Sequence, residues 1–378
     1  SFDLSLDAAF GGVTIDADGV VDSLVEPAAL DLTVAASGPD LAAVGALAGI
    51  GDLPDEAISV SGRVHWDGFP IKFVEVNVSS GQNTASLDGV LGALPQMLET
   101  DFRFRAAGPD LSAFQGVAGV DLPQGRFLAE GHLIRLENGV GVNTVVARVG
   151  ETMLEMRGFV GDPPEFAGTK LGVEVAGPDL SDFAGLAGVD LPAEPFEVRG
   201  GFEYADEDLA LDSGEFRVGQ NSARASGTVR VTNGFAGTNV RLHVEGPDLS
   251  QAGLLAGQTG LPADPFRVDG RVRVLENGYA LDTVTAQLAD LVVSAEGRVG
   301  PLPELGGTDL RLDVQGPDLS WVGRLVGRQD LPADPFRVTA GVQVLDDGYR
   351  LRTVDALLGD VAVKVDGRVG PPPELEGT

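Results

Sequence analysis

Hydrophobic and polar residues alternate along stretches of about ten residues in this sequence, and the stretch Phe266–Leu275 shows the pattern most regularly. Its charged side chains fall on one face, and the other face carries Phe266, Val268, Gly270, Val272 and Val274. A period of two residues predicts a β-strand with one dry and one wet face. Asn277-Gly278 follows and predicts a type I′ hairpin turn, in which both central residues have positive φ. A second strand is expected from about Tyr279 to Leu288.

Two further strands continue the same pattern. A third strand is expected at Leu291–Val299, directly after a tight connection. After a loop rich in proline and glycine, a fourth strand carries Leu310, Leu312 and Val314 on one face. Four short strands joined by short turns predict an antiparallel meander.

A short helix is expected after each fourth strand. Leu319, Val322 and Leu325 have the spacing of a helix of about two turns, which Gly327 can end. So short a helix is unstable alone and must pack on the sheet. The residue before each helix is an aspartate, and its carboxylate is expected to act as an N-cap for the first free N–H groups. These structural caps are Asp40, Asp110, Asp179, Asp248 and Asp318.

Two phrases recur in phase along the chain. Gly-Pro-Asp-Leu begins at Gly38, Gly108, Gly177, Gly246 and Gly316, and Leu-Pro follows in register at Leu53, Leu122, Leu191, Leu261 and Leu331. This recurrence predicts a repeat protein with a period of about 70 residues. We expect residues 1–378 to form one continuous array, with a partial unit at 1–37 and units starting at about 38, 108, 177, 246 and 316. The last unit is truncated, so the sequence is interpreted as a fragment of a longer chain.

These patterns together predict an all-β fold, an elongated repeating antiparallel β-groove. It would contain about five units of roughly 70 residues, each with four strands and one short helix. One short helix for every four strands is too little to cover the apolar side of the sheet. We therefore expect a curled sheet whose apolar concave face is buried by the curling itself, by a partner or by a lipid-like ligand.

The composition excludes several classes of function. The chain has 26 Lys and Arg against 57 Asp and Glu, a formal net charge of −31, which disfavours binding to nucleic acids and polybasic docking on anionic membranes. It has no cysteine, so disulfides, thiolate metal sites and cysteine nucleophiles are excluded. No run of about 18 apolar residues could span a membrane as a helix, and residues 1–30 lack the layout of a signal peptide.

The sequence contains no recognisable catalytic or metal-binding arrangement. His65, His132 and His243 occupy unrelated positions of the repeat, and no phosphate loop or Gly-x-Ser-x-Gly motif is present. Asp16, Asp18 and Asp22 faintly resemble a calcium loop, but the set does not recur and lacks EF-hand spacing. We therefore expect a protein that is not an enzyme and that holds no cofactor or metal.

The longer phrases resemble those of a known family. Gly-Pro-Asp-Leu-(Ser)-x-x-Gly-x-Leu-x-Gly, then Leu-Pro and Phe-Arg-Val-x-Gly-Arg-Val, with a later Val-x-Ala-x-Leu-Gly-Asp at Val354–Asp360, are similar to bacterial AsmA-like proteins, relatives of TamB and YhdP. The resemblance covers essentially the whole chain. It implies a bridge-like lipid-transfer protein of a Gram-negative bacterium, anchored in the inner membrane and spanning the periplasm. The anchor and the terminal domains would lie outside this sequence.

The resemblance implies intermembrane phospholipid transport through a continuous hydrophobic groove that leads to the outer membrane, and the alternation indicates which residues would line the groove. The partners would be phospholipids or other acyl lipids. The predicted groove-lining residues are Val268, Val272, Val274, Val284, Leu288, Val293, Leu310, Leu312, Val314, Val338, Val342, Val344, Val361, Val363, Leu171, Val173, Val175, Val240, Leu242 and Val244.

A different interpretation gives the same positions a purely structural role. In a structural or adhesive extracellular repeat scaffold or filament, they would form a closed, dry core beneath the helices and the curled sheet. An open trough predicts bound lipid, whereas a closed core predicts packing by side chains throughout.

Overall fold

The chain folds almost entirely into antiparallel β-strands. In the computed structural model, the structure describes residues 1–10, 12–23, 29–40, 56–118, 121–187, 191–255, 261–301, 305–325, 331–345 and 347–370. These residues form 22 strands and a few short helices, so the prediction of an all-β fold is confirmed. The chain divides into two compact units, unit 1 at Ser1–Arg199 and unit 2 at Gly200–Thr378.

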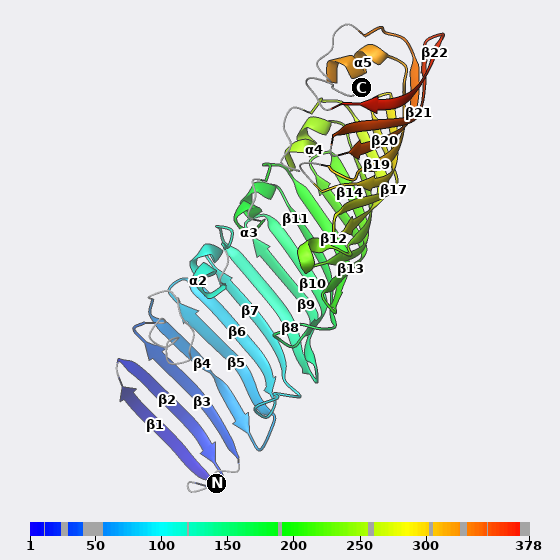
Figure 1. Cartoon of the computed structure of the whole chain (residues 1–378). Coiled ribbons are helices and arrows are strands. Elements are labelled where there is room, and N and C mark those ends of the chain that lie inside the picture. Colours follow the sequence, from blue (N-terminus) through cyan, green and yellow to red (C-terminus); the bar gives the residue numbers. More distant parts are fainter. Residues whose placement is uncertain are drawn as a thin grey trace. The chain divides into compact units, whose positions relative to one another are not determined.

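Unit 1 contains one curled, unclosed sheet in which each strand pairs with its neighbour in sequence (Figure 1). Its strands are β1 (Phe2–Phe10), β2 (Val13–Val21), β3 (Leu30–Gly38), β4 (Ile58–Trp66), β5 (Ile71–Ser80), β6 (Asn83–Leu91), β7 (Asp101–Gly108), β8 (Phe127–Leu136), β9 (Gly139–Val149), β10 (Thr152–Gly161) and β11 (Thr169–Gly177). Short helical segments follow every fourth strand of the described chain, here η1 (Leu111–Phe114) with α2 (Gln115–Ala118), and η2 (Leu180–Phe183) with α3 (Ala184–Ala187).

Unit 2 repeats this arrangement. The unit boundary falls within β12 (Phe196–Ala205). The other strands are β13 (Asp208–Val218), β14 (Asn221–Arg230), β15 (Asn239–Gly246), β16 (Phe266–Leu275), β17 (Gly278–Leu288), β18 (Leu291–Val299), β19 (Asp309–Gly316), β20 (Phe336–Leu345), β21 (Gly348–Leu358) and β22 (Val361–Val369). The helices are η3 (Asn233–Phe235), α4 (Leu249–Leu255) and α5 (Leu319–Leu325).

The strands predicted from alternation match the observed ones closely, but the type of hairpin turn was wrong. Leu275 pairs with Gly278, so the central residues of the turn are Glu276 and Asn277. Neither has a positive φ, and only Gly278 does, at 111°. A type I′ turn needs positive φ at both central residues. Gly278 is required here because a Cβ on it would lie 2.1 Å from the Val299 carbonyl oxygen.

A β-bulge interrupts the second strand of the meander, which the alternation did not predict. The register of β17 shifts between Leu281 and Val284, and Thr283 lies in the left-handed region with φ of 49°. Equivalent shifts occur near Glu75 in β5 and Thr353 in β21, with φ of 51° and 49°. The extra residue reverses the alternation, so residues three apart share one face of the sheet.

The aspartates of the repeated phrase cap the helices. Asp110 is extended (φ −152°, ψ 117°), and its carboxylate accepts hydrogen bonds from Ser112 N at 3.0 Å and Gly125 N at 3.1 Å. The carboxylates of Asp179, Asp248 and Asp318 accept from the N–H two residues later at 2.8–2.9 Å. After β7 and β11 the first helical turn is a 3₁₀ turn instead of the expected α-helix.

Two of the predicted helix features fall on residues outside the described ranges. The helix expected after Asp40 is one of them, and the helix end expected at Gly327 is the other.

A buried phenylalanine follows each of the helical segments that come after β7, β11, β15 and β19. It is the first residue of the strand after the helix, at Phe127, Phe196, Phe266 and Phe336, and each is only 6–8% exposed. The Phe127 ring meets Phe114 of η1 edge to face, with ring centroids 5.8 Å apart. The Phe196 ring meets Phe183 of η2 in the same way, with centroids 5.5 Å apart, so these contacts hold η1 and η2 at one end of the strands.

Candidate functional site

One face of the sheet in unit 1 carries apolar side chains and glycine in three neighbouring rows. Each row is formed by residues that face one another across β1 to β11, or that flank a bulge, as Gly62 and Val76 do. The first row is Ala8, Ile15, Ala36, Val60, Val78, Ala85, Ala106, Ala129, Ala147, Leu154 and Val175. The second is Leu6, Ala17, Val34, Gly62, Val76, Leu87, Phe104, Gly131, Val145, Met156 and Val173. The third is Leu4, Gly19, Leu32, Val64, Phe73, Gly89, Phe102, Leu133, Val142, Gly158 and Leu171.

Unit 2 has three rows of the same kind across β13 to β22. The first is Phe216, Ala223, Val244, Val268, Ala286, Val293, Val314, Val338, Ala356 and Val363. The second is Gly214, Ala225, Leu242, Gly270, Val284, Ala295, Leu312, Ala340, Val354 and Val365. The third is Leu211, Gly227, Val240, Val272, Leu281, Gly297, Leu310, Val342, Leu351 and Gly367. We call the surface formed by the three rows of a unit its row face.

The bulges and the glycines keep the rows free of polar side chains. Without the bulge at Thr283, strict alternation would place Leu281 and Val284 on opposite faces of β17. Gly270 lies beside this bulge, and a Cβ on it would lie 2.7 Å from a methyl group of Val284. In unit 1, Gly131 leaves room for the Phe104 ring, because a Cβ on Gly131 would lie 2.8 Å from it. No row therefore contains a charged or hydrogen-bonding side chain.

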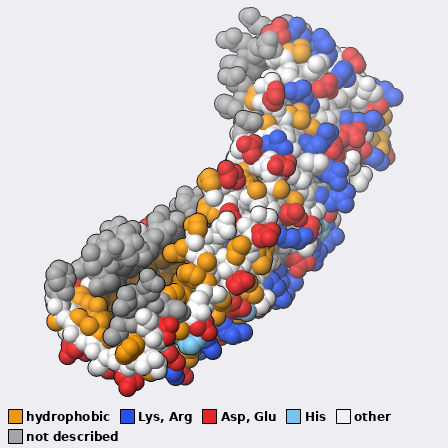
Figure 2. Space-filling view, turned by 90° about the horizontal axis from the view of Figure 1, so that it is seen from below, with side chains coloured by type: hydrophobic (Ala, Val, Ile, Leu, Met, Phe, Trp, Pro, Cys, Tyr) orange, Lys and Arg blue, Asp and Glu red, His pale blue; other side chains and the backbone are white. Residues whose placement is uncertain are grey.

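Most side chains of the row faces are in contact with solvent. Of the hydrophobic side chains in the rows of both units, only Ala17, Val142 and Leu171 are buried. The solvent-accessible surface is 22481 Å² for a 39.0 kDa chain, whereas two separate compact proteins of half this mass would together expose about 17,000 Å². Figure 2 shows hydrophobic side chains gathered in a hollow of the surface, beside an outer face rich in charged side chains.

The twenty residues predicted to line a groove all lie on the row side of the sheet. Sixteen belong to the three rows of unit 1 or unit 2. The other four lie on the same face just beyond the rows, two residues along the strand from a row residue. Val274 and Val344 extend past the third row, and Leu288 and Val361 extend past the first row. Sequence reasoning missed Tyr279, Leu281 and their counterparts before each bulge, although an apolar spacing of three residues signals them.

The opposite face of the sheet carries ion pairs between neighbouring strands. Arg63 Nε lies 2.6 Å from Asp31, and Arg267 lies 2.6 Å from Glu245. The guanidinium of Arg63, by hydrogen bonding, holds the pKa of the Asp31 carboxyl below its usual value. Arg267 lowers the pKa of Glu245 in the same way. These pairs stabilise the charged forms of the carboxylates on the wet face.

The histidines and the acidic residues near the N-terminus do not form a shared site. His132 lies 2.6 Å from Asp101 and His243 lies 2.5 Å from Asp269, each on the charged face. Asp18 accepts a hydrogen bond from Ser5 at 2.7 Å. Within the described ranges, no three acidic or histidine side chains converge so that they could hold a metal ion. The helices described there are also too short to cross a membrane.

An apolar pocket of about 320 Å³ lies at the helix end of the row face in unit 1. Leu111 and Phe114 of η1 form one side, and Val78, Ala106 and Phe127 of the sheet contribute to the other. Ligand pockets in proteins commonly have volumes of this order. The helix covers this end of the row face but leaves space beneath it.

A scan against protein-family models and searches of curated proteins and of solved structures find no match for this chain.

Proposed function

We propose that the row face of each unit binds the acyl chains of phospholipids, and that the chain is a segment of a bridge-like lipid-transfer protein of the AsmA-like kind. Such a protein would carry lipids across the periplasm of a Gram-negative bacterium toward the outer membrane. The single observation that supports this most is the partial exposure of three parallel rows of apolar side chains in each unit. An exposed apolar surface of this extent is typical of a binding site for an apolar ligand.

Acyl chains would lie along the rows while the headgroups remain in water. Exposing a CH₂ group to water costs roughly 0.8 kcal/mol, so a free lipid with about fifteen methylenes in a chain faces a barrier of roughly 12 kcal/mol per chain. The row face removes most of this cost because it keeps the chain in contact with apolar atoms. The rows contain no polar side chain, so no position along them would hold a passing lipid more tightly than the next.

A charged substitution on the row face tests this proposal. Leu312→Asp places a carboxylate in the second row of unit 2, between Ala295 and Ala340. We expect the phospholipid that co-purifies with the gently isolated protein, measured by mass spectrometry, to fall at least several-fold. Gln315→Asp on the same strand is the matched control, because Gln315 lies on the charged face opposite Arg337.

Two results would contradict the proposal. One is phospholipid absent from the unaltered protein, which is the result that a closed-core scaffold predicts. The other is an equal lipid content in both variants when circular dichroism shows that both retain their β-structure.

A further inference from the structure

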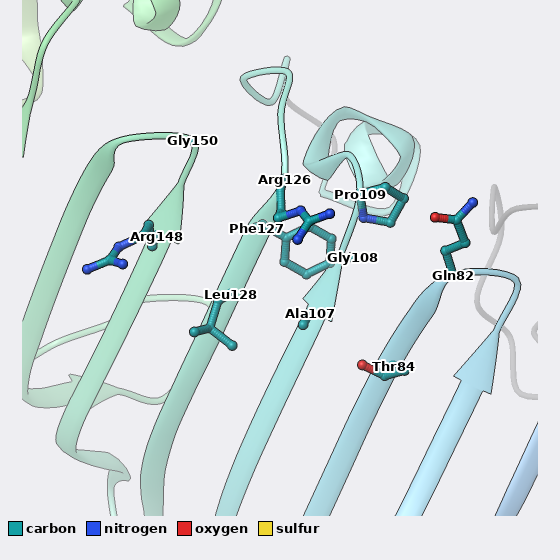
Figure 3. A pocket seen from close by; sticks show the side chains of 10 residues that line it. All are labelled: Gln82, Thr84, Ala107, Gly108, Pro109, Arg126, Phe127, Leu128, Arg148 and Gly150. Atoms are coloured by element: carbon teal, nitrogen blue, oxygen red, sulfur yellow. The ribbon is translucent and has the colours of Figure 1, made fainter.

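A second pocket in unit 1, of about 440 Å³, lies at the ends of β6 to β9 (Figure 3). Gln82, Thr84 and Leu128 line it together with two arginines, Arg126 and Arg148. Figure 3 shows Arg126 and Gln82 on either side of Pro109, with Arg148 on a neighbouring strand. A hydrogen bond of 2.8 Å from Gly150 N to the Arg126 carbonyl oxygen joins the chain segments that carry the two arginines. We call this space the arginine pocket.

The two arginines lack the carboxylate partners that most other arginines in the described part of the chain have. Among the described residues, no carboxylate forms an ion pair with Arg126 or Arg148, and both are exposed. On the same face, Arg63, Arg105 and Arg135 each bind a carboxylate on another strand or loop. In a chain with a net charge of −31, these two arginines leave positive charge beside the pocket that no carboxylate neutralises through an ion pair.

The corresponding pocket of unit 2 shows how the arginine pocket differs. That pocket, of about 540 Å³, is formed by the same strand positions, but its arginine is neutralised because Arg267 lies 2.6 Å from Glu245. In the arginine pocket, Leu128 replaces Arg267 and Ala107 replaces Glu245. Arg126 and Arg148 stand where the pocket of unit 2 has a proline and a glutamine. The arginine pocket therefore lacks the ion pair of the unit 2 pocket and has two arginines that form no ion pair with a carboxylate.

Apolar side chains lie on both sides of Arg148. Leu128 pairs directly with Arg148, and Met153, which is 42% exposed, lies on the other side of Arg148. Three residues, Thr84, Ala107 and Phe127, line both the arginine pocket and the apolar pocket beneath η1. The arginine pocket lies on the charged face and the apolar pocket on the row face, and the two meet around the ends of the same strands.

We propose that the arginine pocket binds a phosphate group, and that this phosphate belongs to the headgroup of a phospholipid whose acyl chain passes around the strand ends to the apolar pocket beneath η1. The phosphate would accept charge-assisted hydrogen bonds from the planar guanidinium groups, whose geometry suits phosphate oxygens. Gln82 and Thr84 supply further neutral donors. The lipid part of this assignment rests on the proposed function, whereas phosphate binding does not.

The test compares two variants of the whole 378-residue chain by isothermal titration calorimetry. Arg126→Gln with Arg148→Gln removes both cations of the pocket. Arg311→Gln with Arg350→Gln removes the same charge elsewhere on the sheet and is the matched control. The ligands are inorganic phosphate, dihexanoyl phosphatidic acid below its micellar concentration, and dihexanoylglycerol, which lacks the phosphate.

We expect dihexanoyl phosphatidic acid to bind at least tenfold more weakly to the pocket variant, and equally well to the unaltered protein and the control. Inorganic phosphate should bind more weakly than the lipid but show the same dependence on the two arginines. If phosphate alone binds as tightly as the lipid, the source is free phosphate and the assignment to a headgroup is overturned. Equal affinity of the lipid for both variants would show that Arg126 and Arg148 do not bind its phosphate, and would overturn the proposal.

Dihexanoylglycerol separates this proposal from the function on which it partly rests. Its binding should not depend on the arginines, because it has no phosphate. If it binds while phosphatidic acid gains nothing from the arginines, the row face keeps its function and the arginine pocket fails. If phosphate binds through the arginines and neither lipid binds, the pocket stands, while its assignment to a headgroup and the lipid-binding row face both fail.

Discussion

At the scale of residues, the glycine that opens each of the last four Gly-Pro-Asp-Leu phrases is required because a phenylalanine ring on the next strand lies against it. A Cβ on Gly316 would lie 2.9 Å from the Phe336 ring, and Gly177 and Gly246 stand in the same relation to Phe196 and Phe266. The sequence predicts the aspartate of the phrase as a cap because capping is a local interaction. The role of the glycine depends on a residue about twenty positions later, which alternation alone does not identify.

Replacing Gly316 by alanine tests this contact. We expect Gly316→Ala to lower the free energy of unfolding by about 1–3 kcal/mol, because the added methyl group overlaps the Phe336 ring. The measurement is urea denaturation followed by circular dichroism. Adding Phe336→Leu should recover part of the loss, as a coupling in a double-mutant cycle. Gly367→Ala, where a Cβ meets nothing within 4 Å, is the control, and equal losses in both single variants would refute the contact.

At the scale of elements, strand existence and length were predictable from the sequence, and the position of the bulge was not. The predicted strand Phe266–Leu275 agrees with β16 residue for residue. In β17 (Gly278–Leu288) the alternation predicted the strand but identified its apolar face only after the bulge, because Asp282 and Thr283 look like ordinary residues of a wet face. The bulge arises from pairing with β16 and β18, which is a property of the sheet. The lining residues before the bulge were missed for this reason.

The left-handed conformation of Thr283 gives a prediction for the bulge. A β-branched residue at φ of 49° is strained, whereas glycine adopts this conformation freely. We expect Thr283→Gly to raise the free energy of unfolding by ~0.5–1 kcal/mol. Relief of the left-handed backbone is worth roughly 1–2 kcal/mol, and the larger conformational entropy that glycine loses on folding offsets part of it. Thr285→Gly, two residues later in the regular strand, should lower it by about 0.5–1 kcal/mol. A loss in both variants, measured by urea denaturation, would show that Thr283 is not strained.

At the scale of the whole molecule, a small apolar core accompanies a large charged surface. Among the described residues few hydrophobic side chains are buried, and the principal ones are the four phenylalanines at the helix ends of the strands. The sequence predicted that short helices could not cover the apolar side of the sheet, because helix length follows from spacing and capping. It gave no indication of the arginine pocket, because Arg126 and Arg148 lie more than twenty residues apart and meet only through strand pairing.

The ion pairs of the charged face predict how stability depends on pH. Arginines hold the pKa of Asp31, Asp208 and Glu245 below the values of the unfolded chain. Their contribution is complete above the unfolded pKa of about 4 and is lost as pH falls through the folded pKa. We expect Tm, measured by circular dichroism, to fall steadily from pH 5 to pH 3. A variant with Arg63, Arg230 and Arg267 changed to glutamine should show a shallower fall, and an identical slope would contradict this account.

The central claim is that acyl chains lie against the row faces, and photo-crosslinking in cells tests it most directly. The photoreactive amino acid p-benzoylphenylalanine is placed at Leu312 on the row face and, as matched control, at Arg311 on the charged face. With radiolabelled phospholipid, the account predicts a labelled adduct at Leu312 and a signal several-fold weaker at Arg311. No adduct at Leu312, or equal labelling at both positions, would contradict it.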